Sequence, residues 1–274
     1  MPSVASRVAT VPDTLPAVSK LYTTEAALYD LAFDWDVDDE VDWLVERLGS
    51  DCSPVLEPAC GSGRMLAAFA RRGIQAVGLD VSSQMLAIAE ERLRPFGGRA
   101  HVVRADVATF DLGAEFGGAM CPIGSLALLT DESDAVAHLA RVAAHLRPGS
   151  RYFVQLELRL PDDPWRGVAA SDWEAERDGV RVHARWDVQS IDLDACLETH
   201  RSRLEVFSGP EIGRVHQECH VVAAWTPGRW RTAVARTPFA YRAVWDGDQP
   251  GYPERAVGST GRLLWHELVN RGLA

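Results

Sequence analysis

The sequence predicts an α/β protein built on a mostly parallel sheet of seven strands with helices on both faces. It also predicts an antiparallel β-sheet inserted late in the chain. Between residues 55 and 157, short apolar runs alternate with helical patterns, which is typical of a parallel sheet. Over residues 180–188, apolar and polar residues alternate strictly, which is typical of a half-exposed antiparallel strand. A chain of 274 residues is long enough to bury both.

These patterns divide the chain into five segments. Thr226 and Pro227 have the residue types that begin a helix, so a helix resumes after the inserted strands. The expected segments are a loosely held arm (1–17), an N-terminal helical cap (18–50), a ligand-binding core (51–157), an inserted antiparallel lid (158–225), and the C-terminal part of the core with a helix and the last two strands (226–274).

Residues 55–66 carry the strongest functional signal. They read Val-Leu-Glu-Pro-Ala-Cys-Gly-Ser-Gly-Arg-Met-Leu, an apolar strand that ends in an acid and a run of small residues. Ala59, Gly61 and Gly63 alternate where the backbone must turn sharply or let a ligand approach. A helix that begins near Arg64 offers its free N–H groups at the same place. The sequence therefore predicts a ligand-binding turn.

Two kinds of cofactor use such a turn. A dinucleotide site needs a third small residue, and counted from Gly61 that position holds the bulky Leu66. Counted from Ala59, the pattern is small-x-Gly-x-Gly with Glu57 just ahead. This pattern resembles the first motif of class I S-adenosylmethionine-dependent methyltransferases.

Further landmarks follow in order. Asp80 ends a second strand 23 residues after Glu57, where a carboxylate can accept hydrogen bonds from the two hydroxyls of a ribose. After a strand at 101–104, Asp106 can accept a hydrogen bond from an adenine amino group. The Leu-Arg-Pro-Gly-Ser run at 146–150 is similar to the Leu-x-Pro-Gly-Gly turn of the same family. The resemblance covers residues 21–157 and implies a Rossmann-like core.

The resemblance also implies S-adenosylmethionine as cofactor and S-adenosylhomocysteine as product. Met85 would lie along the adenine, and Tyr22 or Tyr29 in the cap would place an aromatic ring near the sulfonium. The aromatic residues could instead simply anchor the cap helix to the sheet. The full set of expected cofactor contacts is Tyr22, Tyr29, Glu57, Ala59, Gly61, Gly63, Asp80, Val81, Met85, Asp106, Val107 and Cys121.

The inserted lid is similar to that of glycine, deoxyamino-sugar and related natural-product methyltransferases. The function expected is therefore methyl transfer to a nitrogen or oxygen of a small-molecule metabolite by direct displacement, in a pocket from which the lid excludes water. There are two alternatives: the protein methylates a carbon atom of a small molecule, or it binds the cofactor without transferring methyl. A nicotinamide oxidoreductase is opposed by Leu66.

Three residues are candidates for handling the methyl acceptor. On the strand expected at 213–224, His216 and His220 share a face with Glu218, and either imidazole could act as a base. The alternative is that this face is solvated. Glu157, near the end of the fifth strand, could hold a cationic amine or orient a hydroxyl, or could pair with a nearby arginine. No metal site is expected, because a strand separates Cys219 from the two histidines.

Composition excludes other classes of function. A net charge of −11 argues against nucleic acid as a partner, because binding phosphates requires clustered cations. No apolar run reaches the roughly 18 residues of a membrane helix, and no apolar signal core stands at the N-terminus, so a soluble, cytoplasmic protein is expected. Five cysteines without a Cys-x-x-Cys pair do not form a disulfide framework. An exposed edge of the inserted sheet could support a homodimer.

Overall fold

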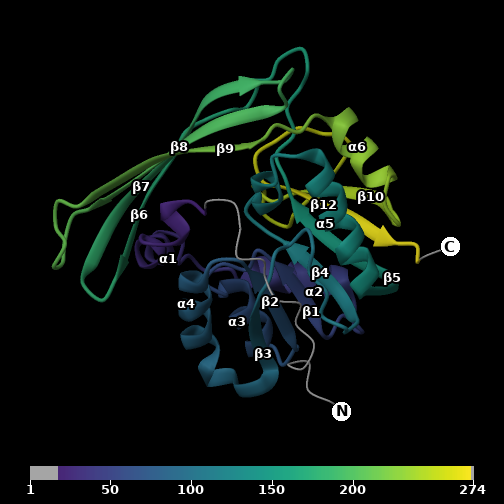
Figure 1. The fold of residues 1–274 in the computed structure, drawn as a ribbon, viewed down its shortest axis with the longest axis horizontal. Coiled ribbons are helices and arrows are strands. Elements are labelled where there is room, and N and C mark those ends of the chain that lie inside the picture. The colour runs from purple at the N-terminus through teal and green to yellow at the C-terminus, as the bar shows by residue number, and fades with distance from the viewer. Residues whose placement is uncertain (1–17, 273–274) are drawn as a thin grey trace.

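The computed structural model describes residues 18–272, and its main sheet has the strand order β11-β10-β12-β5-β4-β1-β2-β3 (Figure 1). Strands β3, β2, β1, β4 and β5 run parallel, while β12 is antiparallel to β5 and β10. The strands are β1 (Val55–Pro58), β2 (Ala76–Asp80), β3 (Ala100–Arg104), β4 (Phe116–Cys121), β5 (Leu146–Gln155), β10 (Phe239–Asp246), β11 (Glu254–Arg255) and β12 (Leu264–Asn270).

The predicted α/β class and mostly parallel sheet are confirmed, with one strand more than the seven expected. The additional strand, β11, forms because the chain folds back after β10, so that Glu254 lies opposite Trp245. The 17 residues of the expected N-terminal arm lie outside the described part of the chain.

Helices cover both faces of the main sheet. Helices α2, α3 and α4 pack on one face, and α5 and α6 pack on the other, each with its own hydrophobic cluster. The helices are α1 (Ala26–Ala32), α2 (Asp38–Leu48), α3 (Arg64–Arg71), α4 (Ser83–Leu93), α5 (Glu132–His145) and α6 (Pro227–Ala235), with short 3₁₀ turns η2 (Lys20–Tyr22), η3 (Arg94–Arg99) and η4 (Ser125–Leu128). Thr226 caps α6 and Pro227 opens it, as predicted.

A second, antiparallel sheet extends to one side of the core and is called the lid sheet here (Figure 1). Its order is β6 (Ser171–Arg177), β7 (Val180–Asp192), β8 (Leu197–Val206) and β9 (Val215–Ala223). Asp178 and Gly179 both have positive φ in the β6–β7 turn, which is the geometry of a tight hairpin. All four strands fall within the predicted lid. The five segment boundaries themselves stay predictions. A homodimer formed through this sheet also stays a prediction.

The chain enters and leaves the lid sheet through two segments that lie side by side. Leu158, just after β5, pairs with Trp225, just after β9, and the N–H of Arg159 donates to the carbonyl of Trp225 at 2.7 Å. The segment that enters the lid sheet and the segment that leaves it are therefore both fixed near the carboxyl end of β5. The lid sheet is consequently anchored at the edge of the main sheet where parallel strands bind ligands.

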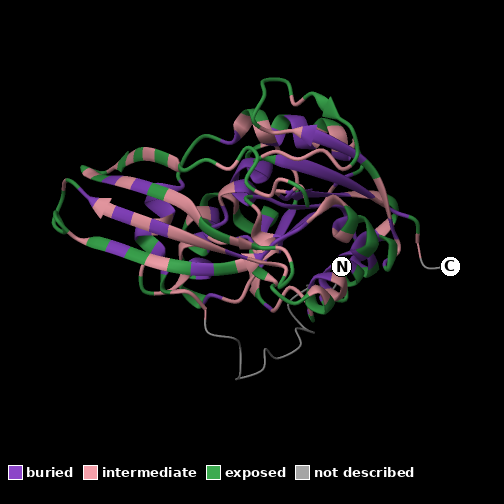
Figure 2. Ribbon diagram, turned by 90° about the horizontal axis from the view of Figure 1, so that it is seen from above, coloured by how far each residue is buried: buried purple, intermediate pink, exposed green. Residues whose placement is uncertain are grey.

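The inner face of the lid sheet has an apolar far end and a polar middle. At the far end, Val182, Ala184, Leu204 and Val206 pack with α1. Figure 2 shows bands of buried and exposed residues alternating along these strands. The side chains in the middle of this face are Trp186, Glu198, His200, Ser202, Glu218 and His220.

Candidate active site

The glycine turn between β1 and α3 has the backbone geometry that the sequence predicts. Ala59, Gly61 and Gly63 all have positive φ, at 56°, 51° and 73°. A side chain at Gly61 would meet no atom within 4 Å, so the space beside this residue is free for a ligand. The N–H of Cys60 donates to the carbonyl of Leu79 at 2.8 Å and ties the turn to β2.

Asp80, at the end of β2, connects this turn to the next one. One carboxylate oxygen accepts from the N–H of Gly61 at 2.9 Å, and the other accepts from the N–H of Ser82 at 2.8 Å. Burial raises the pKa of Asp80, while these backbone hydrogen bonds favour its charged form. The side chain is thus held in place beside the free space at Gly61.

Glu57 is the most buried acid of the turn. Its side chain is 2% exposed, and its Oε2 atom has no hydrogen-bond partner among the described residues. Burial raises its pKa well above the usual range, and Arg64 is the nearest charge that opposes the shift. An orphaned buried oxygen beside a glycine turn fits a site that a ligand completes.

The structure explains why a large residue is tolerated at position 66. Leu66 on α3 packs directly onto Gly78 of β2, and a Cβ built on Gly78 would lie only 2.5 Å from Leu66 Cδ1. The close approach of helix and strand is therefore achieved with a small residue on the strand. A third glycine on the helix is not needed for it.

Tyr22 and Tyr29 lie between the core and the lid sheet. Their rings make an edge-to-face contact at 5.2 Å, and Tyr22 lies 6.5 Å from the ring of His220. Burial raises the pKa of Tyr22, and the neighbouring charges of Asp80 and Glu218 raise it further. The carbonyl of Tyr22 accepts from the hydroxyl of Ser82, so Tyr22 links the residues that follow β2 to the lid sheet.

The remaining residues predicted to contact the cofactor lie after β2, β3 and β4 and differ in their hydrogen-bond partners and burial. Asp106 accepts from the N–H of Ala108 at 2.7 Å, and the carbonyl of Val107 bonds to His138, whose other nitrogen lies 2.7 Å from the hydroxyl of Tyr152. Cys121 ends β4 with a buried thiol whose pKa burial raises to about 12. Met85 is buried behind the cap residue Ser82, and Val81 accepts from Arg104.

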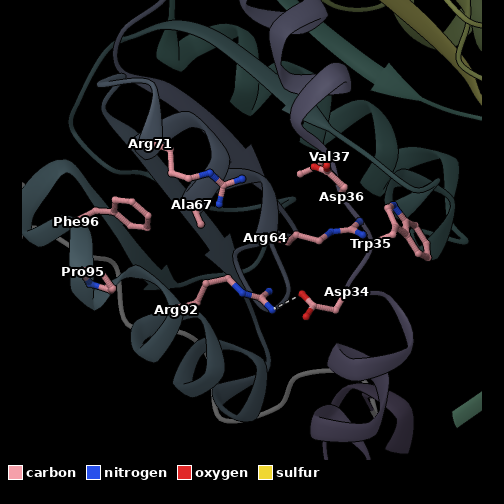
Figure 3. A pocket seen from close by; sticks show the side chains of 10 residues that line it. All are labelled: Asp34, Trp35, Asp36, Val37, Arg64, Ala67, Arg71, Arg92, Pro95 and Phe96. Carbon is pink, nitrogen blue, oxygen red and sulfur yellow. Dashed lines mark hydrogen bonds and ion pairs between the residues drawn. The ribbon is translucent and has the colours of Figure 1, made fainter. Parts of the chain in front are cut away.

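A cavity of about 220 Å³ lies between the segment that joins α1 to α2, helix α3, and the end of α4 with η3 (Figure 3). Arg64 places its guanidinium over the ring of Trp35 at 4.4 Å and donates to the carbonyl of Phe33. Arg92 donates to the carbonyl and hydroxyl of Ser62 and pairs with Asp34 at 3.0 Å. These arginines fasten the N-terminal cap to the turn.

The two lid histidines are buried, so the solvated-face alternative is wrong for both. His216 and His220 are 9% and 8% exposed, because α1 and η2 pack against this face of the lid sheet. His220 stacks on Trp186 and shares a 2.6 Å hydrogen bond with Ser202. His216 lies four residues away along β9, about 13 Å at the usual rise of a strand. The two imidazoles therefore do not act at the same point.

Glu157 is the first member of a chain of side chains that continues through Arg159 and Glu198 to His200. Arg159 donates from Nη2 to Glu157 Oε2 at 2.8 Å, so the arginine-pairing alternative describes the contact that is present. The same guanidinium donates from Nε and Nη2 to both oxygens of Glu198, at 2.8 and 2.7 Å. Glu198 Oε2 lies 2.9 Å from Nε2 of His200. Although burial raises the pKa of Glu157, the Arg159 charge opposes that shift.

Residues 18–272 contain no group of three or more side chains placed to hold a metal ion. None of the helices in this part of the chain is long and apolar enough to cross a membrane. The five cysteines are free thiols.

Comparisons with known proteins identify the family. A family model described as a methyltransferase domain matches residues 55–149. The dTDP-3-amino-3,6-dideoxy-alpha-D-glucopyranose N,N-dimethyltransferase of Streptomyces fradiae is 30% identical over 193 residues, which are 69% of this chain and 71% of the relative. The chain belongs to the class I S-adenosylmethionine-dependent methyltransferases.

Two further comparisons place this methyltransferase. The ubiquinone biosynthesis O-methyltransferase of Xanthomonas campestris is 25% identical over 170 residues, 62% of this chain and 70% of the relative. The solved structure of an S-adenosylmethionine-bound amino pentose methyltransferase from Micromonospora echinaspora has a TM-score of 0.69 at 21% identity, covering 94% and 99% of the two chains. This likeness confirms the predicted methyltransferase fold.

S-adenosylmethionine is accordingly the cofactor of this methyltransferase, and the residues present fit it. The open space at Gly61, the carboxylate of Asp80 beside it and the orphaned oxygen of Glu57 all lie at one edge of the sheet. When bound, the cofactor supplies an electrophilic methyl group on a sulfonium. The individual contacts assigned from the sequence stay predictions.

Sequence reasoning missed the chain formed by Arg159, Glu198 and His200. A signal was present, because Glu198, His200 and Ser202 alternate with other residues along an expected strand and so share a face. Arg159 carried no comparable signal, since it stands outside any regular element.

Proposed function

We propose that this methyltransferase transfers methyl to a nitrogen or oxygen of a small molecule, by direct displacement in a pocket covered by the lid sheet. Of these two acceptor atoms we favour nitrogen, in the form of an amine. The Streptomyces fradiae relative, an N,N-dimethyltransferase of an amino sugar nucleotide, supports an amine acceptor. The scattered arginines and net charge of −11 give no support to a nucleic acid acceptor.

The observation that carries the proposal is the charge at the carboxyl end of β5. Glu157 and Glu198 are held by one guanidinium, so this group of three charged side chains has a net charge of −1. The side chain of Glu157 is 29% exposed, in contrast to 2% for Arg159 and 4% for Glu198. Because Arg159 is shared with Glu198, its charge does not fully neutralise Glu157, and a partly exposed carboxylate of this kind favours a cationic group such as an ammonium.

The chain's own residues have three tasks in this mechanism. Glu157 binds and orients the acceptor amine, and the glycine turn with Asp80 holds the cofactor at the neighbouring strand ends. The lid sheet and Tyr22 exclude water between them, which strengthens the electrostatic contacts inside the pocket. No protein nucleophile is required, because the acceptor itself attacks.

The test compares acceptors that differ at one atom. The purified protein is incubated with S-adenosylmethionine and either dTDP-3-amino-3,6-dideoxy-α-D-glucopyranose or its 3-hydroxy counterpart, and S-adenosylhomocysteine is quantified by mass spectrometry. We expect methylation of the amine, and a Glu157→Gln variant that raises KM for the amine without changing cofactor affinity. Intact cofactor with every acceptor would contradict the proposal and favour a cofactor-binding protein without transfer.

An O-methyl acceptor is the second candidate, because the Xanthomonas campestris relative is an O-methyltransferase. Preferential methylation of a phenol or of the 3-hydroxy sugar in the same assay would favour it. Methylation of carbon would be recognised by NMR, which would show the new methyl group bonded to a carbon atom of the acceptor.

A further inference from the structure

The imidazole of His200 lies at the centre of the polar middle of the lid sheet's inner face. Its register partner on β9 is His220, and directly opposite residues in neighbouring strands have Cβ atoms about 5 Å apart. The ring of His220 in turn lies 6.5 Å from the ring of Tyr22, whose carbonyl accepts from the hydroxyl of Ser82 just after β2. On its other side, His200 is joined through Glu198 and Arg159 to Glu157 at the end of β5.

His200 therefore stands between the proposed amine-binding carboxylate and the proposed cofactor site. The charged and titratable groups that face it are Glu198 on its own strand, His220 on β9, and Arg159 and Glu157 from the segment that follows β5. Its side chain is 19% exposed, so part of the ring is accessible to a ligand, whereas Glu198 behind it is 4% exposed.

The hydrogen bond to Glu198 determines which nitrogen of His200 is basic. Nε2 faces a carboxylate, which only accepts, so Nε2 carries a proton, and in the neutral ring the lone pair is therefore on Nδ1. Arg159 fixes that carboxylate from the other side with two hydrogen bonds. The contact between Glu198 and His200 matches the general design in which a buried carboxylate orients an imidazole base and stabilises its cation.

The two histidines expected from the sequence are less suited to this role. Nε2 of His220 is engaged with the hydroxyl of Ser202, and its ring is stacked on Trp186 at an interplanar angle of 7°. Burial, the largest cause, lowers the pKa of His220. His216 lies farther along β9, beside the α1 contact.

We infer that His200 is the base that removes a proton from the acceptor ammonium, and that Glu198, clamped by Arg159, is the positioning residue that fixes its tautomer. This inference rests on the proposed amine acceptor. In the step, one N–H bond of the ammonium breaks and an Nδ1–H bond forms, so the amine regains its lone pair and His200 becomes an imidazolium beside the Glu198 carboxylate. The overall charge of the pocket does not change.

The first test needs no acceptor. ¹⁵N NMR of histidine-labelled protein should show His200 as the Nε2–H tautomer, and E198Q should lose that preference while E198D keeps it. The pair His183–Asp172 on β6 and β7 is a matched control, because it is an imidazole–carboxylate contact on the same sheet outside the proposed site. A D172N variant should leave the His200 signals unchanged. A wild-type Nδ1–H tautomer of His200 would overturn the inference.

The second test uses turnover of dTDP-3-amino-3,6-dideoxy-α-D-glucopyranose. H200A should lower kcat on the order of 100-fold or more, with cofactor affinity unchanged, and added imidazole should restore part of the rate. H183A should neither lower kcat nor respond to imidazole. If the wild-type enzyme methylates the amine and H200A is equally active, the inference fails while the proposed function stands. If the wild-type enzyme methylates only hydroxyl acceptors, the proposed amine function fails and the inference fails with it.

Discussion

The carboxylate of Asp80 lies 2.9 Å from the backbone nitrogen of Gly61, and this contact joins the end of β2 to the glycine turn after β1. The other oxygen of the same carboxylate accepts from Ser82, the residue that caps α4. One side chain therefore fixes the two turns between which the cofactor is expected to bind.

Replacing Asp80 with alanine should weaken S-adenosylmethionine binding by about 2–3 kcal/mol, because ribose hydroxyls lose a charged acceptor and the glycine turn loses its tie. Calorimetric titration measures the change. The control is Asp111→Ala, since Asp111 also accepts from a backbone N–H in a loop but is exposed. Equal affinity in wild-type and D80A protein would show that Asp80 does not hold the ribose.

Tyr22 should distinguish the charged cofactor from its neutral product. If its ring lies near the sulfonium, Tyr22→Ala should weaken S-adenosylmethionine binding by roughly 0.5–2 kcal/mol more than S-adenosylhomocysteine binding. Tyr22→Phe keeps the ring and should keep the ratio of the two affinities. Tyr252, which stacks on Trp43 in the core, provides the control substitution to alanine. A parallel loss for both ligands in Y22A would mean that the ring only anchors the cap.

Gly78 should not tolerate a side chain. A methyl group there would lie 2.5 Å from Leu66 Cδ1 and 2.6 Å from Cys60 Sγ, so Gly78→Ala should destabilise the protein by about 1–3 kcal/mol through overpacking. Urea unfolding measures the difference. Gly98 has no atom within 4 Å of its Cβ position and a φ that is not positive, so Gly98→Ala is the control. A G78A protein as stable as G98A would contradict the close packing described here.

Two buried histidines should make stability depend on pH. Burial lowers the pKa of His138 and of His266 to about 4. Between pH 6.5 and 4 the unfolded chain binds protons that the folded protein does not, so stability is present above this range and is lost as the pH falls through it. Each histidine should contribute about 1.4 kcal/mol per pH unit in that window.

Urea unfolding at pH 7.5, 6 and 5 tests this dependence. A His138→Gln variant should show a smaller slope than the wild-type protein, because it lacks one of the two groups. Identical slopes in the wild-type and H138Q proteins would be evidence against a buried neutral imidazole at position 138.

Several features could be predicted from the sequence because their causes are local. Gly61 and Gly63 adopt positive φ angles because glycine has no Cβ to oppose them. Helix α6 begins where a capping threonine is followed by a proline. Asp80 could be placed because carboxyl ends of parallel strands meet at one edge. These features involve neighbours in sequence or a topology that the alternation of strands and helices dictates.

The role of the lid histidines could not be predicted in the same way. Alternation showed that His216 and His220 share a face, but burial of that face is decided by α1 and η2, which lie about 190 residues earlier in the chain. Likewise, Leu66 is accommodated by a glycine on a different element. Tertiary packing alone determines both outcomes.

The sequence by itself thus determined the class of fold, the family and the edge of the sheet where the cofactor is expected. Only the tertiary structure decided which side chains of the lid sheet are buried, and that Arg159 holds Glu198 against His200. The physical reason is that Arg159 and Glu198 are separated by 39 residues and meet only because β5 and β9 end side by side. Local residue patterns record turns and strand faces, but they do not record which distant surface covers them.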